Sequence, residues 1–389
     1  MTANVYGIAS TGKGIYIPPG WGTNWKAKLT AAQAGTGTAV AAAMGGSSTQ
    51  GYYASDLRFK GWFGLLRSSL QAICGAGGSG FRSSSMTALF QSANGVPTAA
   101  TSAYNAVGNL ATLGGAWSAG GNAYGPGGYY VYTQASGATW TLSVTGTTIK
   151  IFTVDGGGNH ANWTYSIDGA AAVTVTDSGS AQATIRTTAI TGLATGPHQV
   201  VITYAGNGSN FLSVVGIAGE NTAGVIFNDF SRYGSRAGDY ALADQTLATP
   251  FNAGASYPAD LAIFAHGPND AAHGDTGDTW ARNTRLLMQN VRDANSNAEL
   301  MIVLPNVGNF DTANYLYQDY AGPARGLAEA FGAALVDFWA IGNNTWNYWN
   351  SLGYWASASN PGAAGSDTVH PSDAGHQFIA NTLLPYLTV

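Results

Sequence analysis

The feature that most restricts the fold is a change in the sequence pattern between about residues 120 and 219. Short runs in this stretch are rich in β-branched or aromatic residues, and Gly, Asn or Asp turns separate them. The eight runs lie at 129–133, 139–144, 147–154, 162–167, 171–176, 181–187, 198–204 and 211–217. This succession of short strands predicts an all-β sandwich.

Strand and helix patterns alternate on both sides of this stretch. Apolar runs typical of buried strands lie at 38–44, 225–229, 260–266, 300–305 and 334–338. Runs with helical spacing lie at 57–73, 279–295, 315–333 and 372–384, and Asp56 is placed to start the first of them. Alternation of this kind predicts an α/β fold with a parallel sheet, interrupted by the all-β stretch.

The predicted organisation has three parts. Residues 1–37 form an irregular leader, 38–119 together with 221–389 form a split α/β domain, and 120–220 form the inserted sandwich. Three consecutive independent domains are the alternative. The split domain is favoured because the part before residue 120 holds only one clear strand and one clear helix, too little to close a core alone.

Composition excludes several classes of protein. The chain has 389 residues, of which only 9% are charged, with 15 Lys or Arg against 20 Asp or Glu and no basic run, so it lacks a nucleic-acid footprint. Its single cysteine, Cys74, excludes a disulfide framework and a cysteine-based zinc site. No signal-peptide pattern opens the chain, and no apolar run is long enough for a spanning helix. We expect a soluble chain.

Two short motifs could carry nucleophilic chemistry. Ser47 lies in a Gly-rich turn, GGSSTQG, directly after the strand-like run 38–44, where a hydroxyl would be exposed at the end of a strand. Asp367 precedes His370 by three residues, so its carboxylate could orient the imidazole toward a nucleophile. Read alone, each has a structural interpretation: a strand-to-helix turn for the first, and a capping residue beside a surface histidine for the second.

Two further residues follow predicted strands and could stabilise an oxyanion. Asn269, in GPND, follows the run 260–266 and carries a side-chain amide, while Gly234 follows the run 225–229 and could offer a backbone N–H. The carboxyl ends of parallel strands meet at one edge of a sheet. We therefore expect these groups to converge with Ser47 there.

Taken together, these residues resemble the SGNH (GDSL-like) hydrolase family, which supplies a Ser, a Gly, an Asn and a His in this chain order. The resemblance covers roughly residues 38–119 and 221–389 and implies a flavodoxin-like three-layer α/β/α domain; the insertion, jelly-roll-like, lies outside it. It implies Ser47 as nucleophile, His370 as base, Asp367 as its acid partner, and Ser47, Gly234 and Asn269 as the oxyanion hole. No metal or organic cofactor is implied.

The family's usual G-D-S motif is altered in this chain. Gly46 stands where the Asp would be, and Ser48 is an adjacent alternative nucleophile. The S-x-T-x-G alignment of Ser47, Thr49 and Gly51 favours Ser47. The implied activity is hydrolysis of acetyl or other short acyl esters on a cell-surface glycan or glycolipid. The alternative is a non-catalytic receptor-binding protein that keeps the fold.

The stretches 61–66 and 75–81 and the leader's end at 34–37 also look like SGNH modules of tail proteins from bacteriophages that infect actinobacteria. This narrower likeness implies a virion-tail or otherwise extracellular location and a possible homotrimer.

Other residues have competing interpretations. A metal site is conceivable from side chains around the Asn269 loop, and arginines near Gly234 could contact substrate or form salt bridges. His376 is interpreted as a helix residue rather than a rival base, and the aromatic residues of the insertion are interpreted mainly as core, with one or two left to stack on sugar. The candidates for the metal site are His266, His273, Asp275 and Asp278, and the arginines are Arg232 and Arg236. The insertion contains His160, His198 and the aromatic candidates Tyr129, Tyr130, Trp140, Trp163 and Tyr165.

Overall fold

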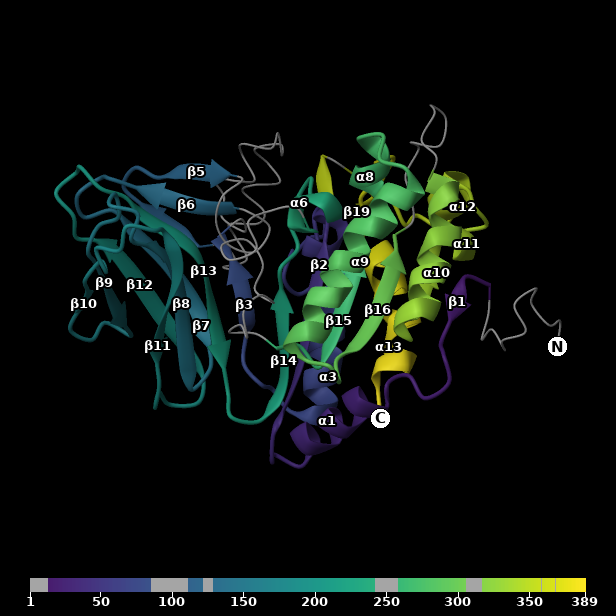
Figure 1. The fold of residues 1–389 in the computed structure, drawn as a ribbon, viewed down its shortest axis with the longest axis horizontal. Coiled ribbons are helices and arrows are strands. Elements are labelled where there is room, and N and C mark those ends of the chain that lie inside the picture. Colours follow the sequence, from purple (N-terminus) through teal and green to yellow (C-terminus); the bar gives the residue numbers. More distant parts are fainter. Residues whose placement is uncertain are drawn as a thin grey trace.

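The structure is a computed structural model, and it describes residues 13–84, 111–121, 129–241, 258–305, 317–357, 359–367 and 369–389. Figure 1 shows two parts side by side, a layered α/β part and a β-rich part to its left. None of the helices in these ranges is both long and apolar enough to cross a membrane.

A parallel sheet forms the centre of the α/β part. Its strands lie in the order β17-β16-β15-β2-β14-β3, every neighbouring pair is parallel, and the two-residue strand β1 adds an antiparallel edge beside β17. The bounds are β1 Ile15–Tyr16, β2 Thr38–Gly45, β3 Gly80–Ser83, β14 Gly224–Asp229, β15 Leu261–Ala265, β16 Glu299–Leu304 and β17 Ala334–Asp337. Strand β15 is apolar throughout, and β16 is apolar after Glu299, because helices cover both faces of the sheet.

Strand β2 shows how the two faces are covered. Ala41 and Ala43 pack in one hydrophobic cluster with α1 (Thr23–Gln33), α3 (Trp62–Cys74) and α13 (Asp373–Leu387). Ala42 and Met44 pack in another cluster with α9 (Gly277–Ala294) and α10 (Ala321–Phe331). Because successive side chains of a strand point to opposite faces, the sheet lies between two helical layers. The predicted three-layer α/β/α class is confirmed.

The β-rich part continues the same sheet. Strand β13 (Leu212–Glu220) pairs antiparallel with β3, and β8, β6, β11 and β5 extend the sheet beyond it, while a second sheet has the order β10-β9-β12-β7-β4. The bounds are β4 Thr112–Gly114, β5 Ser118–Gly121, β6 Tyr129–Thr133, β7 Thr139–Thr145, β8 Thr148–Asp155, β9 Trp163–Ile167, β10 Val173–Val175, β11 Thr184–Ile190 and β12 Pro197–Tyr204. Side chains from both sheets share one core cluster, in which Ile151 and Val214 meet Val200 and Ile202.

The division into domains remains a prediction, but two details of the chain differ from it. Strands β4 and β5 pair with β7 and β6, so this part already includes Thr112, ahead of the predicted boundary near residue 120. The continuous pairing of β3 with β13 also joins the two parts through backbone hydrogen bonds.

The N-terminal stretch is more regular than expected. The leader was predicted to be irregular, yet it contains β1 and helix α1, which buries Trp25 and Leu29 against the sheet. Its apolar positions are few, which is why the spacing gave no helical pattern.

Helix α3 begins later than the apolar spacing suggested, at Trp62. Asp56 does not start it: its side chain instead accepts the backbone N–H groups of Arg58 and Phe59 in a turn before the helix.

Candidate active site

Three adjacent strands deliver the predicted site residues to one edge of the sheet. Ser47 is the first residue of the short helix α2 (Ser47–Gln50), which follows β2. Asn269 lies in α8 (Pro268–Ala272), after β15, and Gly234 lies between β14 and α6 (Ala237–Ala241). Because β14, β2 and β15 are parallel neighbours, these connections all leave the same end of the sheet.

Ser47, His370 and Asp367 form a hydrogen-bonded chain. The Ser47 hydroxyl oxygen lies 2.9 Å from His370 Nε2, and His370 Nδ1 lies 3.1 Å from an Asp367 carboxylate oxygen. With the proton on Nδ1 donated to the carboxylate, Nε2 is an acceptor for the serine hydroxyl. The two loops that meet here are 323 residues apart in the sequence.

The Asp367 carboxylate is held in its ionised form. Burial alone would raise its pKa, but the hydrogen bond and charge of His370 and two backbone N–H groups outweigh this, so its pKa is lowered. The same oxygen accepts the N–H groups of Val369 at 2.7 Å and of His370 at 2.6 Å. The short turn therefore fixes the carboxylate and the ring together.

Ser48 faces a different group. Its hydroxyl donates to the Val369 carbonyl at 3.4 Å, whereas the Ser47 hydroxyl is the one beside the imidazole. Both serines line a hollow with a free volume of about 10 Å³, together with Asn269, His266 and Ser235.

Gly46 and Asn269 are in close contact. A Cβ added to Gly46 would lie 2.9 Å from the Asn269 side-chain nitrogen, and that nitrogen donates to the Ser235 carbonyl at 3.1 Å. Asn269 Nδ2 has a second hydrogen available for the hollow. Gly234, with φ +70°, is not among the residues that line the hollow, although its neighbour Ser235 is.

Three tyrosines surround His370, and the sequence analysis did not identify them. The ring centroids of Tyr52, Tyr53 and Tyr233 lie 4.8, 5.2 and 6.4 Å from that of His370, and Tyr233 stacks nearly parallel to it. Burial raises the pKa of Tyr53 and of Tyr233, and the Asp367 charge adds to both shifts, so the phenols stay neutral hydrogen-bond donors. The only sequence signal that could have identified these tyrosines is that they lie close to Ser47 and Gly234 in the chain.

Gln50 joins two of the loops. Its side chain is 1% exposed, and its carbonyl oxygen accepts the N–H of Tyr233 at 3.1 Å. The helix that begins with Ser47 is thereby tied to the connection that contains Gly234.

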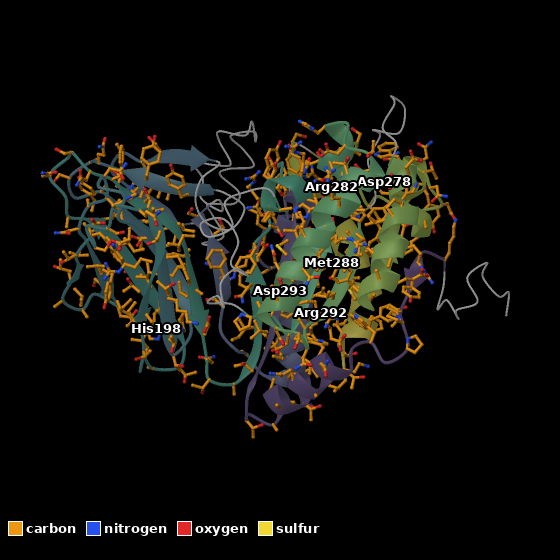
Figure 2. The ribbon with its side chains drawn as sticks, in the orientation of Figure 1. His198, Asp278, Arg282, Met288, Arg292 and Asp293 are labelled. Carbon is orange, nitrogen blue, oxygen red and sulfur yellow. The ribbon has the colours of Figure 1, made fainter. Side chains whose placement is uncertain are left out.

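The candidates for a metal site do not converge. Within the ranges that the structure describes, no three His, Cys, Asp or Glu side chains group in a way that could hold a metal ion. His266 is buried, which lowers its pKa to about 3, whereas His273 lies 2.6 Å from an Arg236 nitrogen. Figure 2 shows Asp278 near the upper end of α9.

The other polar candidates have structural partners. Arg232 and Arg236 both form salt bridges to Asp239 at 3.0 Å. His376 is buried and accepts the N–H of Trp62, and burial lowers its pKa to about 4. His198 pairs with Asp168 at 2.6 Å in the β-rich part, far from α9 in Figure 2.

Most described aromatic candidates of the β-rich part pack in its interior. Trp140 and Trp163 are 1% and 3% exposed, and Tyr130 and Tyr165 are partly buried against core clusters. The side chain of Tyr129 lies outside the described residues. The prediction that most of these rings are core holds for both tryptophans.

The arrangement at the end of β2 has the form of an acyl-transfer site: a hydroxyl, an imidazole and a carboxylate in series on a three-layer α/β/α fold. The model of the GDSL-like lipase/acylhydrolase family matches residues 177–378, more than half of the chain, so the chain belongs to this family and is an ester hydrolase. The matched range contains Gly234, Asn269, Asp367 and His370, and Ser47 precedes it. No curated protein matches the chain by sequence.

Solved structures support the fold. A peptidoglycan O-acetylesterase is similar, with a TM-score of 0.64, 17% identity, and coverage of 94% of this chain and 95% of that chain. A family two carbohydrate esterase with a carbohydrate-binding domain from Corynascus thermopiles has a TM-score of 0.30, 15% identity, and coverage of 70% and 98%. Protein YXIM from Bacillus subtilis has a TM-score of 0.35, 15% identity, and coverage of 69% and 86%. Only the first score is high enough to support a shared fold.

Proposed function

We propose that this chain is a serine esterase that removes acetyl or similarly short acyl groups from a cell-surface glycan or glycolipid. The observation that carries the proposal is the series of contacts from Ser47 through His370 to Asp367. A hydroxyl 2.9 Å from an oriented imidazole can lose its proton as it attacks a carbonyl carbon.

The proposed reaction has two halves. Ser47 Oγ bonds to the acyl carbon while His370 Nε2 accepts the serine proton, and His370 then gives this proton to the departing sugar hydroxyl. In the second half, His370 takes a proton from water, the resulting hydroxide attacks the acyl-serine, and the proton returns to Ser47 as the carboxylic acid leaves. The ionised Asp367 stabilises the imidazolium in both halves.

The oxyanion of each tetrahedral intermediate needs preorganised donors. We assign this role to the Ser47 N–H, the Gly234 N–H and the Asn269 amide, of which Ser47 and Asn269 line the same hollow. A single donor of this kind contributes about a hundredfold to a thousandfold to kcat.

The size of the hollow favours a short acyl group. Its free volume of about 10 Å³ is close to the room needed by one water molecule. The hollow is small and partly open to solvent, so it encloses a methyl group more completely than a longer acyl chain. We therefore expect faster turnover of p-nitrophenyl acetate than of p-nitrophenyl butyrate.

A glycan substrate and an envelope setting are the finer parts of the proposal. One solved structure that shares this fold is that of a peptidoglycan O-acetylesterase, and the likeness of 61–66 and 75–81 to phage tail modules suggests a virion-borne enzyme that acts on an actinobacterial wall. Release of acetate from O-acetylated actinobacterial wall preparations tests the substrate, and light scattering tests the homotrimer.

Adjacent serine variants test the catalytic assignment. Ser47→Ala should lower kcat on p-nitrophenyl acetate at least about a thousandfold, because it removes the nucleophile. Ser48→Ala is the matched control and should retain most activity, since that hydroxyl faces the Val369 carbonyl. A fluorophosphonate probe followed by peptide mapping should label Ser47. Equal turnover by Ser47→Ala and the unaltered protein would contradict the proposal and favour a binding protein that keeps the fold.

A further inference from the structure

A second cavity lies apart from the hollow at Ser47, between helix α3 and strand β7. Its volume is about 300 Å³, and it shares no lining residue with that hollow. One wall comes from residues 58–79 and the other from Ser143 and Thr145 of β7. The cavity therefore forms where the α/β part meets the five-stranded sheet, and its size is at the lower end of the range of small-molecule sites.

Guanidinium groups gather at this cavity. Arg58 and Arg67 line it, and Arg67 is 8% exposed and donates to the Arg58 carbonyl at 3.0 Å. Arg82 is buried behind the other wall and donates to the Ser143 carbonyl at 3.3 Å. Burial lowers the pKa of Arg67 to about 10 and that of Arg82 to about 9, so both remain cationic at neutral pH.

Two of these guanidinium groups have N–H donors without acceptors in the part of the chain that the structure describes. Arg58 Nε and Arg82 Nη2 are buried, and neither finds an acceptor among the described residues. The opposing carboxylates are Asp56 and Asp229, and burial raises the pKa of Asp229 to about 6, which weakens its negative charge near that pH. Both atoms are out of contact with solvent, so a ligand in the cavity would pair with the terminal nitrogens of Arg58, a partly exposed residue that lines it.

An exposed ring forms one side of the opening. Phe59 is 46% exposed, and the guanidinium carbons of Arg58 and Arg67 lie 5.2 and 5.1 Å from its ring centroid. Both cations thus hold the ring in place beside the cavity. The other wall offers the hydroxyl groups of Ser143 and Thr145. A fixed aromatic face beside hydroxyl and guanidinium groups suits a sugar ring.

We propose that this cavity binds an acidic saccharide, with a carboxylate on the donors of Arg58 and a sugar face on Phe59. The site is separate from the ester-hydrolysing centre, so its occupation does not depend on the proposed catalytic function. A polymer bound there would contact both parts of the molecule at once.

Calorimetric titration of the full chain tests this site. Trigalacturonic acid should bind, whereas maltotriose, which lacks carboxylates, and inorganic phosphate, which lacks a sugar face, should bind at least about tenfold more weakly. Phosphate binding as tight as that of the acidic saccharide would overturn the sugar assignment, and absence of any saccharide binding would overturn the site.

Three variants locate the binding. Arg58→Gln, Phe59→Ala and Ser143→Tyr should each weaken trigalacturonate binding about tenfold or more, the last by filling the cavity from an exposed strand position. Thr203→Tyr is the matched control, because Thr203 lies on the neighbouring strand β12 and does not line the cavity. Hydrolysis of p-nitrophenyl acetate should stay within about twofold in all four. Unchanged affinity in all three cavity variants contradicts the proposal.

Discussion

Gly46 departs from the family's usual motif, and its surroundings give a physical reason. The Asn269 amide occupies the space that a side chain at residue 46 would need, 2.9 Å from the position of a Cβ. The backbone of Gly46 is extended, with φ −82°, so the residue is not required for an unusual backbone conformation. The absence of a side chain is what matters at this position.

Gly46→Ala should therefore affect catalysis more than folding. The added methyl pushes the Asn269 amide by a few tenths of an ångström, and we expect kcat on p-nitrophenyl acetate to fall about tenfold or more because the proposed oxyanion donor is misplaced. The thermal midpoint should change little. Gly322→Ala in α10 is the control, since nothing lies within 4 Å of its added Cβ. An unchanged kcat in Gly46→Ala would argue against Asn269 as a donor.

At the scale of elements, helix α2 and the β14–α6 connection act as one unit. Gln50 accepts the Tyr233 N–H, and the Arg232 N–H and the Ser235 hydroxyl both donate to the Gly45 carbonyl. These bonds set the position of Gly234 relative to Ser47.

Gln50→Leu removes one of these bonds and leaves the partly buried Tyr233 N–H without this acceptor. We expect kcat to fall about tenfold with KM nearly unchanged, and the free energy of unfolding to fall by about 1–3 kcal/mol. Gln377→Leu on the exposed face of α13 is the control and should change neither. If stability falls while kcat is retained, Gln50 only supports the fold.

Strand β12 carries a pH-dependent contact. The hydrogen bonds from His198 to Asp168 and to the Ala194 carbonyl raise the pKa of His198. A raised histidine pKa stabilises the folded state fully below the pKa of the unfolded chain, and the contribution is lost as pH rises through the folded value.

Asp168→Asn tests that contact. Asp168 has φ +52°, a conformation that Asn also tolerates, so the backbone should be preserved. The thermal midpoint of the variant should fall below that of the unaltered protein at about pH 5.5, and the two should converge at about pH 9. If the thermal midpoints of the variant and the unaltered protein differ equally at both pH values, Asp168 is not the cause of the raised pKa of His198.

At the scale of the whole molecule, one sheet crosses from the α/β part into the β-rich part. Strand β3 pairs parallel with β14 and antiparallel with β13, and β13 also pairs with β8 and β6. Removing the β-rich part would expose one edge of β3 and the ring of Phe81, which is 2% exposed. The two parts should therefore unfold together.

Calorimetry should show a single transition, with calorimetric and van't Hoff enthalpies in agreement. A core truncation far from Ser47 gives a second readout. Val200→Ala in β12 creates a cavity in the β-rich core and should lower the temperature at which esterase activity is lost. Two separated transitions, or a fall in melting that spares activity, would show that the parts unfold independently.

Local pattern was enough to predict much of the fold. The alternation of apolar strands with amphipathic helices predicted an α/β fold with a parallel sheet. The resemblance carried by Ser47, Gly234, Asn269, Asp367 and His370 implied the three-layer class and a candidate site. The strand and helix periods and the short motifs are local signals, because each depends only on residues that are close together in the sequence. Two features were not predicted from the sequence. Helix α1 of the leader has few apolar positions to mark it, and a turn at Asp56 delays the start of α3.

The sequence by itself determined the fold class and the family motif with its altered Gly46. Only the tertiary structure decided that the Ser47 hydroxyl, and not that of Ser48, faces His370, that three tyrosines surround this ring, and that β3 joins β13 across the molecule. These outcomes depend on contacts between residues that are often more than a hundred positions apart. Such contacts are selected by packing and hydrogen bonding of the complete chain, and no local period encodes them.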